Sequence, residues 1–436
     1  MRVAYLTAGA AGMYCGSCMH DNTLARALIA RGVDCLLVPT YTPIRTDERD
    51  ISDSQVFFGG INIFLEQKFP LWGRLPAWLT HWLDRPGLLR MATRNTAGAS
   101  PALLGNLTVS MLQGMQGRQR AEVTRLCGWL DTHVSPDVVV LSNFLIGGCV
   151  SELKKRLGAK IVVTLQGDDI FLDYLPEKQR GVSIDLMRHL AEDVDLFLVN
   201  SAFYGKKMAS MLGLSIDKMR VIPLGIDTKP FEDDELFNRE RVETSERPLR
   251  LGYLARLDPA KGLHRLVDAV LELKRLPNGN TFPLELHVAG WLGKQHEPWA
   301  DEQWKRLKEG GFDGRFFYHG SPDHQGKLDF LKRMDLFCVP TEYEECKGLF
   351  VLEAMAAGVP VIAPRHGVFP EMLESEQRGV LVPPGDAPSL AAAIVELAGN
   401  VTGSRAMSIG GRQFVMTERS IDRMAERVHE LFLELL

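Results

Sequence analysis

The segment LRLGYLARLDPAKGLHRLVDAVLEL, residues 249–273, contains the pattern that decides the fold. Leu249–Leu254 form a short, mainly apolar run of strand length, and a loop with Pro259 and Gly262 follows it. From Leu263 to Arg275 the apolar side chains recur at helical spacing. A strand that is followed directly by a helix predicts a βα unit of a parallel sheet.

The same alternation continues over most of the chain, and an acidic stretch, residues 231–248, divides it into two series. The strands expected in the first series are Val3–Leu6, Val33–Val38, Val138–Leu141, Lys160–Leu165, Leu196–Val199 and Arg220–Leu224. Those expected in the second series are Leu249–Leu254, Leu284–Ala289, Arg315–Tyr318, Leu336–Val339, Val359–Ala363 and Gly379–Val382. Helices are expected at Asp21–Ala30, after the N-cap residue Ser201, at Leu263–Arg275 and at Gly348–Ala357.

These patterns predict an α/β protein with two doubly wound parallel sheets in tandem and a cleft between them. The expected domains are residues 1–228, with a helical insertion at about 61–120, and residues 229–415. Residues 416–436 are expected to form a helix that crosses back to the first domain. Ligands of such sheets bind at the carboxyl ends of the strands, so functional residues are expected in the strand-to-helix loops.

Composition and charge narrow the function classes. Of 436 residues, 45% are hydrophobic and 24% charged, which is typical of a globular protein. The 50 basic and 55 acidic residues give a net charge of -5, which does not favour nucleic acid as a partner. Seven scattered cysteines form no disulfide framework, and no secretory leader or spanning apolar run is evident, so we expect a cytoplasmic protein.

Residues 61–94 interrupt the alternation with aromatic and basic side chains. Trp72, Trp78 and Trp82 lie among Lys68 and several arginines. One interpretation is a peripheral contact with the inner membrane face, because aromatic rings sit at headgroup depth while cations attract anionic lipid. The other interpretation is a set of helices that cover one end of the sheet.

The segment ECKGLFVLEAMAAGVPVIAPRHG, residues 345–367, holds two acidic residues. Glu353 lies in a helical pattern among apolar neighbours, where a charge needs a partner or a polar ligand. Glu345 lies in the preceding loop, and Gly348 lets the chain approach a ligand at the start of the helix. The alternative is that Glu345 belongs to a solvated acidic loop and that Glu353 pairs with an arginine.

The loop of the opening segment places Arg256 and Lys261 between a strand and a helix. Two cations at this spacing can contact one diphosphate from both sides and stabilise a leaving group that gains negative charge. The alternative is that both side chains are only solvated.

Two loops of the first series are also candidates. The loop after the first strand carries Gly9, Gly12 and Gly16, which do not match the dinucleotide-binding fingerprint. Its Cys15, Cys18 and His20 are a weak metal signal without a second cysteine pair, so no metal site is expected. In VVTLQGDDIFLD the polar side chains of Gln166 and Asp168 follow a strand and are candidates for orienting a hydroxyl group or for serving as a base. Asp169 could equally be an N-cap.

Taken together, these motifs resemble the retaining glycosyltransferases of the family 4 type, which have the GT-B fold of two facing Rossmann-like domains. The resemblance covers nearly the whole chain. It rests on GYLARLDPAKG, on VIPLGIDTKPF and SAFYGKKMASMLG before it, and on Glu345 and Glu353 in the E-x7-E arrangement ahead of AMAAGVPVIA.

The resemblance implies a role for each candidate in the second domain, which would bind a nucleotide-diphosphate sugar. Arg256 and Lys261 would hold the diphosphate, Glu353 the ribose hydroxyls, and Glu345 the donor sugar near its anomeric carbon. The remaining contacts would come from three segments: the base would lie near Tyr318, His319 and Gly320, the amides of Gly348 and Leu349 would face the phosphates, and residues 366–371 would border the sugar.

The resemblance also implies transfer with retention to a carbohydrate or lipid-linked acceptor, which the first domain would present with the Gly9–Gly16 loop. A UDP-sugar is favoured over a GDP- or ADP-sugar, with no cofactor and no metal, because cations and a helix N-terminus take the place of a divalent ion. Gln166 stands where many relatives have histidine, and Lys347 where an aromatic residue is common. Alternatives are a sugar-nucleotide epimerase-like enzyme and a non-catalytic protein that binds nucleotide or glycan.

Overall fold

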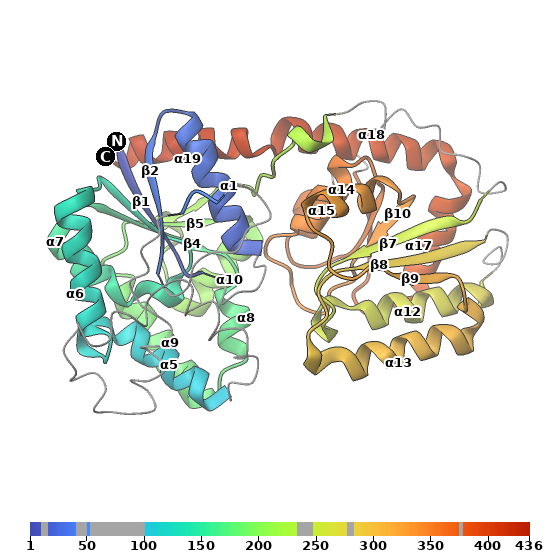
Figure 1. The fold of residues 1–436 in the computed structure, drawn as a ribbon, viewed down its shortest axis with the longest axis horizontal. Coiled ribbons are helices and arrows are strands. Elements are labelled where there is room, and N and C mark those ends of the chain that lie inside the picture. The colour runs from blue at the N-terminus through green and yellow to red at the C-terminus, as the bar shows by residue number, and fades with distance from the viewer. Residues whose placement is uncertain (10–15, 41–49, 53–100, 233–246, 277–282, 375–377) are drawn as a thin grey trace. The chain divides into compact units, whose positions relative to one another are not determined.

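The computed structural model describes residues 1–9, 16–40, 50–52, 101–232, 247–276, 283–374 and 378–436 (Figure 1). The chain forms two compact units: residues 1–224 with 421–436, and residues 225–420. We expected the divisions at 228/229 and 415/416. Each unit is built on a parallel six-stranded sheet, which confirms the predicted α/β class.

The first sheet has the strand order β2-β1-β3-β4-β5-β6. Every neighbouring pair of strands is parallel. The strand β3 reads VVVL and is buried along its whole length, as expected for a parallel sheet with both faces covered. The strands are β1 (Arg2–Thr7), β2 (Asp34–Pro39), β3 (Val138–Leu141), β4 (Lys160–Leu165), β5 (Leu196–Val199) and β6 (Met219–Val221).

Helices of the first unit pack around this sheet. They are α1 (Gly16–Ala30), α5 (Pro101–Gln113), α6 (Arg120–Trp129), α7 (Val150–Leu157), α8 (Asp168–Asp173), α9 (Glu177–Leu190), α10 (Ala202–Leu212) and the C-terminal α19 (Ile421–Leu435). α19 packs against α1, and Arg31 pairs with Glu426 at 3.4 Å between them. Ser201 caps α10 by accepting a hydrogen bond from the amide of Tyr204, as predicted.

The second sheet has the order β12-β11-β10-β7-β8-β9, again all parallel. Its strands are β7 (Leu249–Leu254), β8 (Leu284–Ala289), β9 (Phe316–Tyr318), β10 (Leu336–Cys338), β11 (Val361–Pro364) and β12 (Val380–Val382). Its helices are α12 (Leu263–Glu272), α13 (Glu297–Leu307), α14 (His324–Lys332), α15 (Leu349–Ala356), α16 (Phe369–Leu373), α17 (Ala387–Gly399) and α18 (Val401–Glu418). Figure 1 shows α12 and α13 on one side of this sheet and α14 and α15 on the other.

Some element ends differ from expectation. β6 ends at Val221 instead of Leu224, because Pro223 has no N–H to donate to a neighbouring strand. α1 begins at Gly16, five residues before the expected Asp21, since sequence rules locate helix starts poorly inside a glycine-rich loop. Of the expected helical insertion, α5 and the 3-10 turn Gly114–Gln116 are helical, and residues 61–100 lie outside the described part of the chain.

Candidate functional site

Lys261 lies at the turn between β7 and α12. A short 3-10 helix, Pro259–Lys261, follows the strand, and Gly262 then opens α12 with a φ of 76°. A Cβ atom at Gly262 would stand 1.7 Å from the carbonyl oxygen of Pro340, so only glycine allows the loop after β10 to come this close. The turn thereby brings Lys261 against that loop.

Glu345 lies in the loop after β10 and meets Lys261 there. The Lys261 Nζ donates to Glu345 Oε2 at 2.7 Å, and the Tyr343 hydroxyl donates to the same oxygen at 2.8 Å. Lys261 also donates to the Tyr343 hydroxyl, so the three side chains form a closed cluster. The side chains of Lys261 and Glu345 are only 11% and 5% exposed. The structure therefore brings together two predicted site residues that are 84 positions apart in the chain.

The charge state of Glu345 follows from these contacts. Burial acts to raise its pKa, but the charge of Lys261 and the hydrogen bonds from Lys261 and Tyr343 outweigh burial and lower the pKa to about 2. Glu345 is thus ionised at neutral pH and held rigidly. The solvated-loop alternative does not describe it: Glu342 and Glu344 are exposed, whereas Glu345 is buried.

The backbone around Glu345 is braced by the segment after β11. The amide of Val368 donates to the carbonyl of Glu345 at 2.8 Å. Gly367 has a φ of 60°, and a Cβ atom there would lie 2.5 Å from the same carbonyl oxygen. His366 contributes through its Nε2, which is 3.0 Å from the carbonyl of Thr341. Part of the segment expected to border a donor sugar, residues 366–371, therefore contacts the Glu345 loop.

Helix α15 connects this cluster with Glu353. The Nζ of Lys261 lies 5.1 Å from the centre of the Phe350 ring, in the first turn of the helix. Gly348 precedes that turn with a φ of 64°, and Glu353 follows in the next turn. Lys327 of α14 donates to Glu353 Oε1 at 2.7 Å, so the partner of Glu353 is a lysine and not the arginine of the alternative interpretation. The amides of Gly348 and Leu349 open the helix, as predicted.

Arg256 is the most open of the predicted charged residues. Its side chain is 60% exposed, and its guanidinium lies 3.6 Å from Asp258. Burial and the charge of Glu345 raise the pKa of Tyr343, and the charge of Arg256 opposes that rise. Arg256 is therefore near the cluster but remains able to turn toward a ligand.

The end of β9 forms another part of the second unit's candidate site. The amide of Gly290 donates to the carbonyl of Gly320 at 2.8 Å. The side chains of Glu285, His287 and His319 form a chain, with 3.1 Å between Glu285 Oε2 and His287 Nε2 and 3.0 Å between His287 Nδ1 and His319 Nε2. Burial lowers the pKa of both histidines, so both are neutral near pH 7.

The direction of the hydrogen bonds in this chain follows from its anionic end. A carboxylate only accepts, so His287 carries its proton on Nε2 and accepts from His319 Nε2. His319 then presents Nδ1 as an acceptor. Sequence reasoning singled out His319 and Gly320 but missed Glu285 and His287, which alternate on one face of β8.

In the first unit, Gln166 and Asp168 lie at the carboxyl end of β4. The Nε2 of Gln166 donates to the carbonyl of Ser142 at 2.5 Å and lies 3.4 Å from Asp21 Oδ1. Asp168 accepts from the amides of Phe144 and Gln166 at 2.7 and 3.0 Å, and burial raises its pKa to about 6. Through these contacts Asp168 stabilises the loops after β3 and β4. A role of Asp168 toward an acceptor stays a prediction.

Asp169 is not the N-cap of a helix, which was one of the roles expected for it. Gly167 is the N-cap of α8 with a φ of 115°, and no side chain caps that helix. Asp169 instead accepts from the Tyr204 hydroxyl at 2.7 Å and pairs with Lys207 at 2.9 Å.

The three glycines expected in the loop after the first strand lie in different places. Gly9 follows β1, Gly16 is the first residue of α1, and Gly12 lies outside the described residues.

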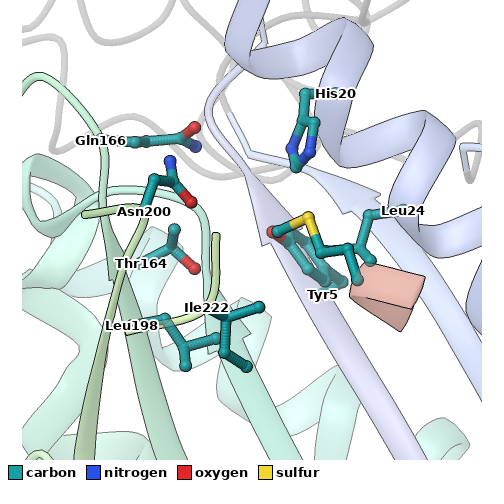
Figure 2. Close-up of a pocket in the computed structure, with 9 residues that line it drawn as sticks. Tyr5, His20, Leu24, Thr164, Gln166, Leu198, Asn200 and Ile222 are labelled. Atoms are coloured by element: carbon teal, nitrogen blue, oxygen red, sulfur yellow. The ribbon is translucent and has the colours of Figure 1, made fainter. Parts of the chain in front are cut away.

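A small cavity lies against the face of the first sheet, beside Gln166. Figure 2 shows His20 of α1 opposite Gln166 and Asn200, with Tyr5 below. The cavity has a volume of about 10 Å³, which is enough for about one water molecule. The other lining residues are Leu24, Thr164, Leu198, Ile222 and Met424. The cavity is therefore too small, as it stands, to hold a sugar.

The described residues contain neither a cluster of metal ligands nor a membrane-spanning helix. No group of three histidine, cysteine, aspartate or glutamate side chains is placed to hold a metal ion among them. Within the same residues, no helix has the length and apolar content needed to cross a membrane.

Comparisons with known proteins follow the same division of the chain. A sequence model described as Glycosyltransferase Family 4 matches residues 107–230, and one described as Glycosyl transferases group 1 matches residues 248–400. The structure is similar to that of Anabaena HepE in complex with UDP, with a TM-score of 0.68 at 15% identity over 100% of both chains. The fold is that of a GT-B protein, and both matching models describe glycosyltransferases.

Within that class, the chain belongs to the glycosyltransferases of the family 4 type, as its motifs indicated. The amylovoran biosynthesis glycosyltransferase AmsK of Erwinia amylovora is 27% identical over 268 residues, which are 60% of this chain and 61% of AmsK. A GDP-mannose-dependent alpha-(1-6)-phosphatidylinositol monomannoside mannosyltransferase of Mycolicibacterium smegmatis is 27% identical over 290 residues, 64% of this chain and 72% of that protein. The chain thus spans between three fifths and three quarters of these relatives.

Proposed function

We propose that this protein is a retaining glycosyltransferase that moves a sugar from a nucleotide-diphosphate sugar to an acceptor hydroxyl. The observation that carries the proposal is the buried, ionised Glu345, which is locked against Lys261 beside the first turn of α15. A buried ion pair is weak evidence for a purely stabilising role, because apolar residues of similar size in the same place often give a protein of equal or greater stability. Its placement at a helix N-terminus and beside an exposed arginine fits a site for an anionic substrate.

Lys261 of the cluster and the nearby Arg256 would stabilise the leaving diphosphate. An ammonium group has three N–H donors, and Lys261 directs hydrogen bonds to Glu345 and Tyr343, which leaves donor capacity for a phosphate oxygen. Arg256 would supply a second cation, and the amides at the start of α15 would supply the positive end of a helix dipole. With these groups as the electrostatic stabiliser, we propose that transfer requires no metal.

Retention requires that the new bond form on the face that the diphosphate leaves. The bond between the anomeric carbon and the phosphate oxygen breaks, and that oxygen takes the proton of the acceptor hydroxyl as the new carbon–oxygen bond forms on the same side. No side-chain base is needed for this step. Gln166 fits this scheme, because an amide can orient a hydroxyl group but does not titrate near neutral pH. Glu345 would bind the donor sugar near the reacting carbon.

The acceptor is proposed to be a carbohydrate or a lipid-linked sugar. AmsK is named for the biosynthesis of amylovoran, and the mycobacterial relative for a phosphatidylinositol monomannoside. Contact with a membrane surface through residues 61–94 would fit a lipid-linked acceptor. We therefore propose a cytoplasmic location with peripheral contact at the inner membrane face. The UDP named for the HepE structure supports a UDP-sugar as the donor, with GDP- and ADP-sugars as the alternatives.

Binding of one nucleotide tests the donor site. We expect UDP, or GDP or ADP in its place, to raise the melting temperature of the purified protein on the order of 5 °C at about one hundred times Kd. The Glu353→Ala variant is expected to lose the response, because the ribose contact is removed. The Glu309→Ala variant, which removes an exposed carboxylate of the same unit, should keep it. A folded wild-type protein that responds to none of the three nucleotides would contradict the proposal.

One observation favours a second candidate function, a non-catalytic protein that binds nucleotide or glycan. Gln166 is held by Ser142 and Asp21 in the place where many relatives have histidine. Such a protein would respond to nucleotide in the same experiment but would not release nucleoside diphosphate from any donor sugar.

A further inference from the structure

Helix α14 links two parts of the candidate site in the second unit. Asp323 caps the helix by accepting a hydrogen bond from the amide of Gly326 at 2.8 Å. The Phe330 ring packs edge-on against the His319 ring, with 5.5 Å between the ring centres. One turn before Phe330, Lys327 reaches Glu353 of α15. The helix therefore spans from the end of β9 to the acidic residue of α15.

The contact between Lys327 and Glu353 engages one side of the carboxylate. The Lys327 Nζ donates to Oε1 at 2.7 Å, and no described residue forms a hydrogen bond with Oε2. The two side chains are 20% and 18% exposed, so the pair is partly shielded from water but still accessible to a ligand. An ammonium group that holds one oxygen limits rotation of the carboxylate and leaves its other oxygen directed to a fixed place.

The pair also decides the net charge that a diphosphate would meet. An uncompensated carboxylate at this position would repel an anionic ligand. Lys327 neutralises Glu353 as Lys261 neutralises Glu345, so the two acidic residues add no net negative charge. The carboxylate can then accept hydrogen bonds from hydroxyl groups without a large electrostatic cost to a neighbouring phosphate.

We propose that Lys327 is a positioning residue, which orients Glu353 so that its second oxygen accepts hydrogen bonds from the ribose hydroxyls of the donor. The inference rests on the proposed function, and it assigns Lys327 a part in distinguishing ribonucleotides from 2′-deoxyribonucleotides. Lys327 contacts the ligand only through Glu353. A lysine that contacted the diphosphate directly, or that only held α14 against α15, would not affect this discrimination.

Titration calorimetry with UDP and 2′-deoxy-UDP tests the inference, and the matching GDP and ADP pairs are used if UDP does not bind. The wild-type protein is expected to bind the ribonucleotide about 10-fold more tightly than the deoxy form, because hydrogen bonds to a charged group are strong. In Lys327→Met the affinity for the ribonucleotide should fall about 10-fold, and that for the deoxy form, which keeps only its 3′-hydroxyl for Glu353, should fall less. Lys327→Arg should retain part of the preference.

The matched control is Lys332→Met, which removes a lysine of the same helix away from Glu353 and should behave as wild type. Thermal unfolding without ligand shows whether each variant is folded; should Lys327→Met be unfolded, Lys327→Gln takes its place. Equal weakening of both nucleotides, or no weakening of either, would overturn the role of Lys327 while leaving the proposed function standing. Failure of the wild-type protein to bind any of the three ribonucleotides would instead count against the proposed function.

Discussion

The Lys261→Met variant is expected to lose about 100- to 1,000-fold in kcat/KM, since it removes a cation from the leaving diphosphate. It is also expected to lose about 3–5 kcal/mol of stability, because it leaves the Glu345 carboxylate buried without its ammonium partner. The two losses have different origins. Transfer kinetics with the donor selected by the nucleotide screen, together with urea unfolding, measures both.

A double variant separates these two effects. Lys261→Met combined with Glu345→Gln removes the buried charge, so most of the lost stability should return while activity stays low. Lys305→Met, which removes an exposed lysine of the same unit, is the control and should change neither quantity. A double variant that regains activity along with stability would show that neither Lys261 nor Glu345 takes part in the reaction.

The second large effect is on acid stability. The pKa of Glu345 in the folded protein is about 2, below its ordinary value of 4.5, so folding favours the ionised form. The resulting stabilisation is complete above pH 4.5 and is lost as the pH falls from 4.5 toward 2. A shift of this size corresponds to about 3 kcal/mol. Between pH 4.5 and 2, we therefore expect the stability of the Glu345→Gln variant to fall by about 3 kcal/mol less than that of the wild-type protein.

Urea unfolding at a series of pH values between 7 and 2 measures the difference between the two proteins. Other carboxylates titrate in both, so the comparison isolates Glu345. Parallel curves for wild type and variant would mean that the Lys261 ion pair does not hold the pKa of Glu345 low.

The fold could be predicted from the sequence where local signals were strong. Runs such as Val138–Leu141 and Leu249–Leu254 coincide with β3 and β7. A short apolar run bounded by turn residues is typical of a buried strand in a parallel sheet. The errors lie at element ends. Pro223 shortens β6, and the glycine-rich loop concealed the start of α1 at Gly16.

The site was less predictable, because its geometry depends on residues distant in the chain. The sequence indicated Lys261, Glu345 and Glu353 as ligand-facing groups, but it did not indicate that each glutamate would pair with a lysine. Lys327 comes from another helix, and only packing of α14 near α15 reveals it. Tyr343 was missed as well, although its place two residues before Glu345 in the loop after a strand was an available signal.

The most direct test of the central claim is the anomeric configuration of the product. The protein is incubated with an α-linked donor whose sugar carries ¹³C, chosen by the nucleotide screen, and with a panel of glycoside and lipid-linked sugar acceptors. The account predicts release of nucleoside diphosphate and an α-linked product, seen by NMR at the anomeric position, with wild-type protein and not with Glu345→Gln. A β-linked product, or nucleotide binding without any transfer by the wild-type protein across the panel, would contradict it.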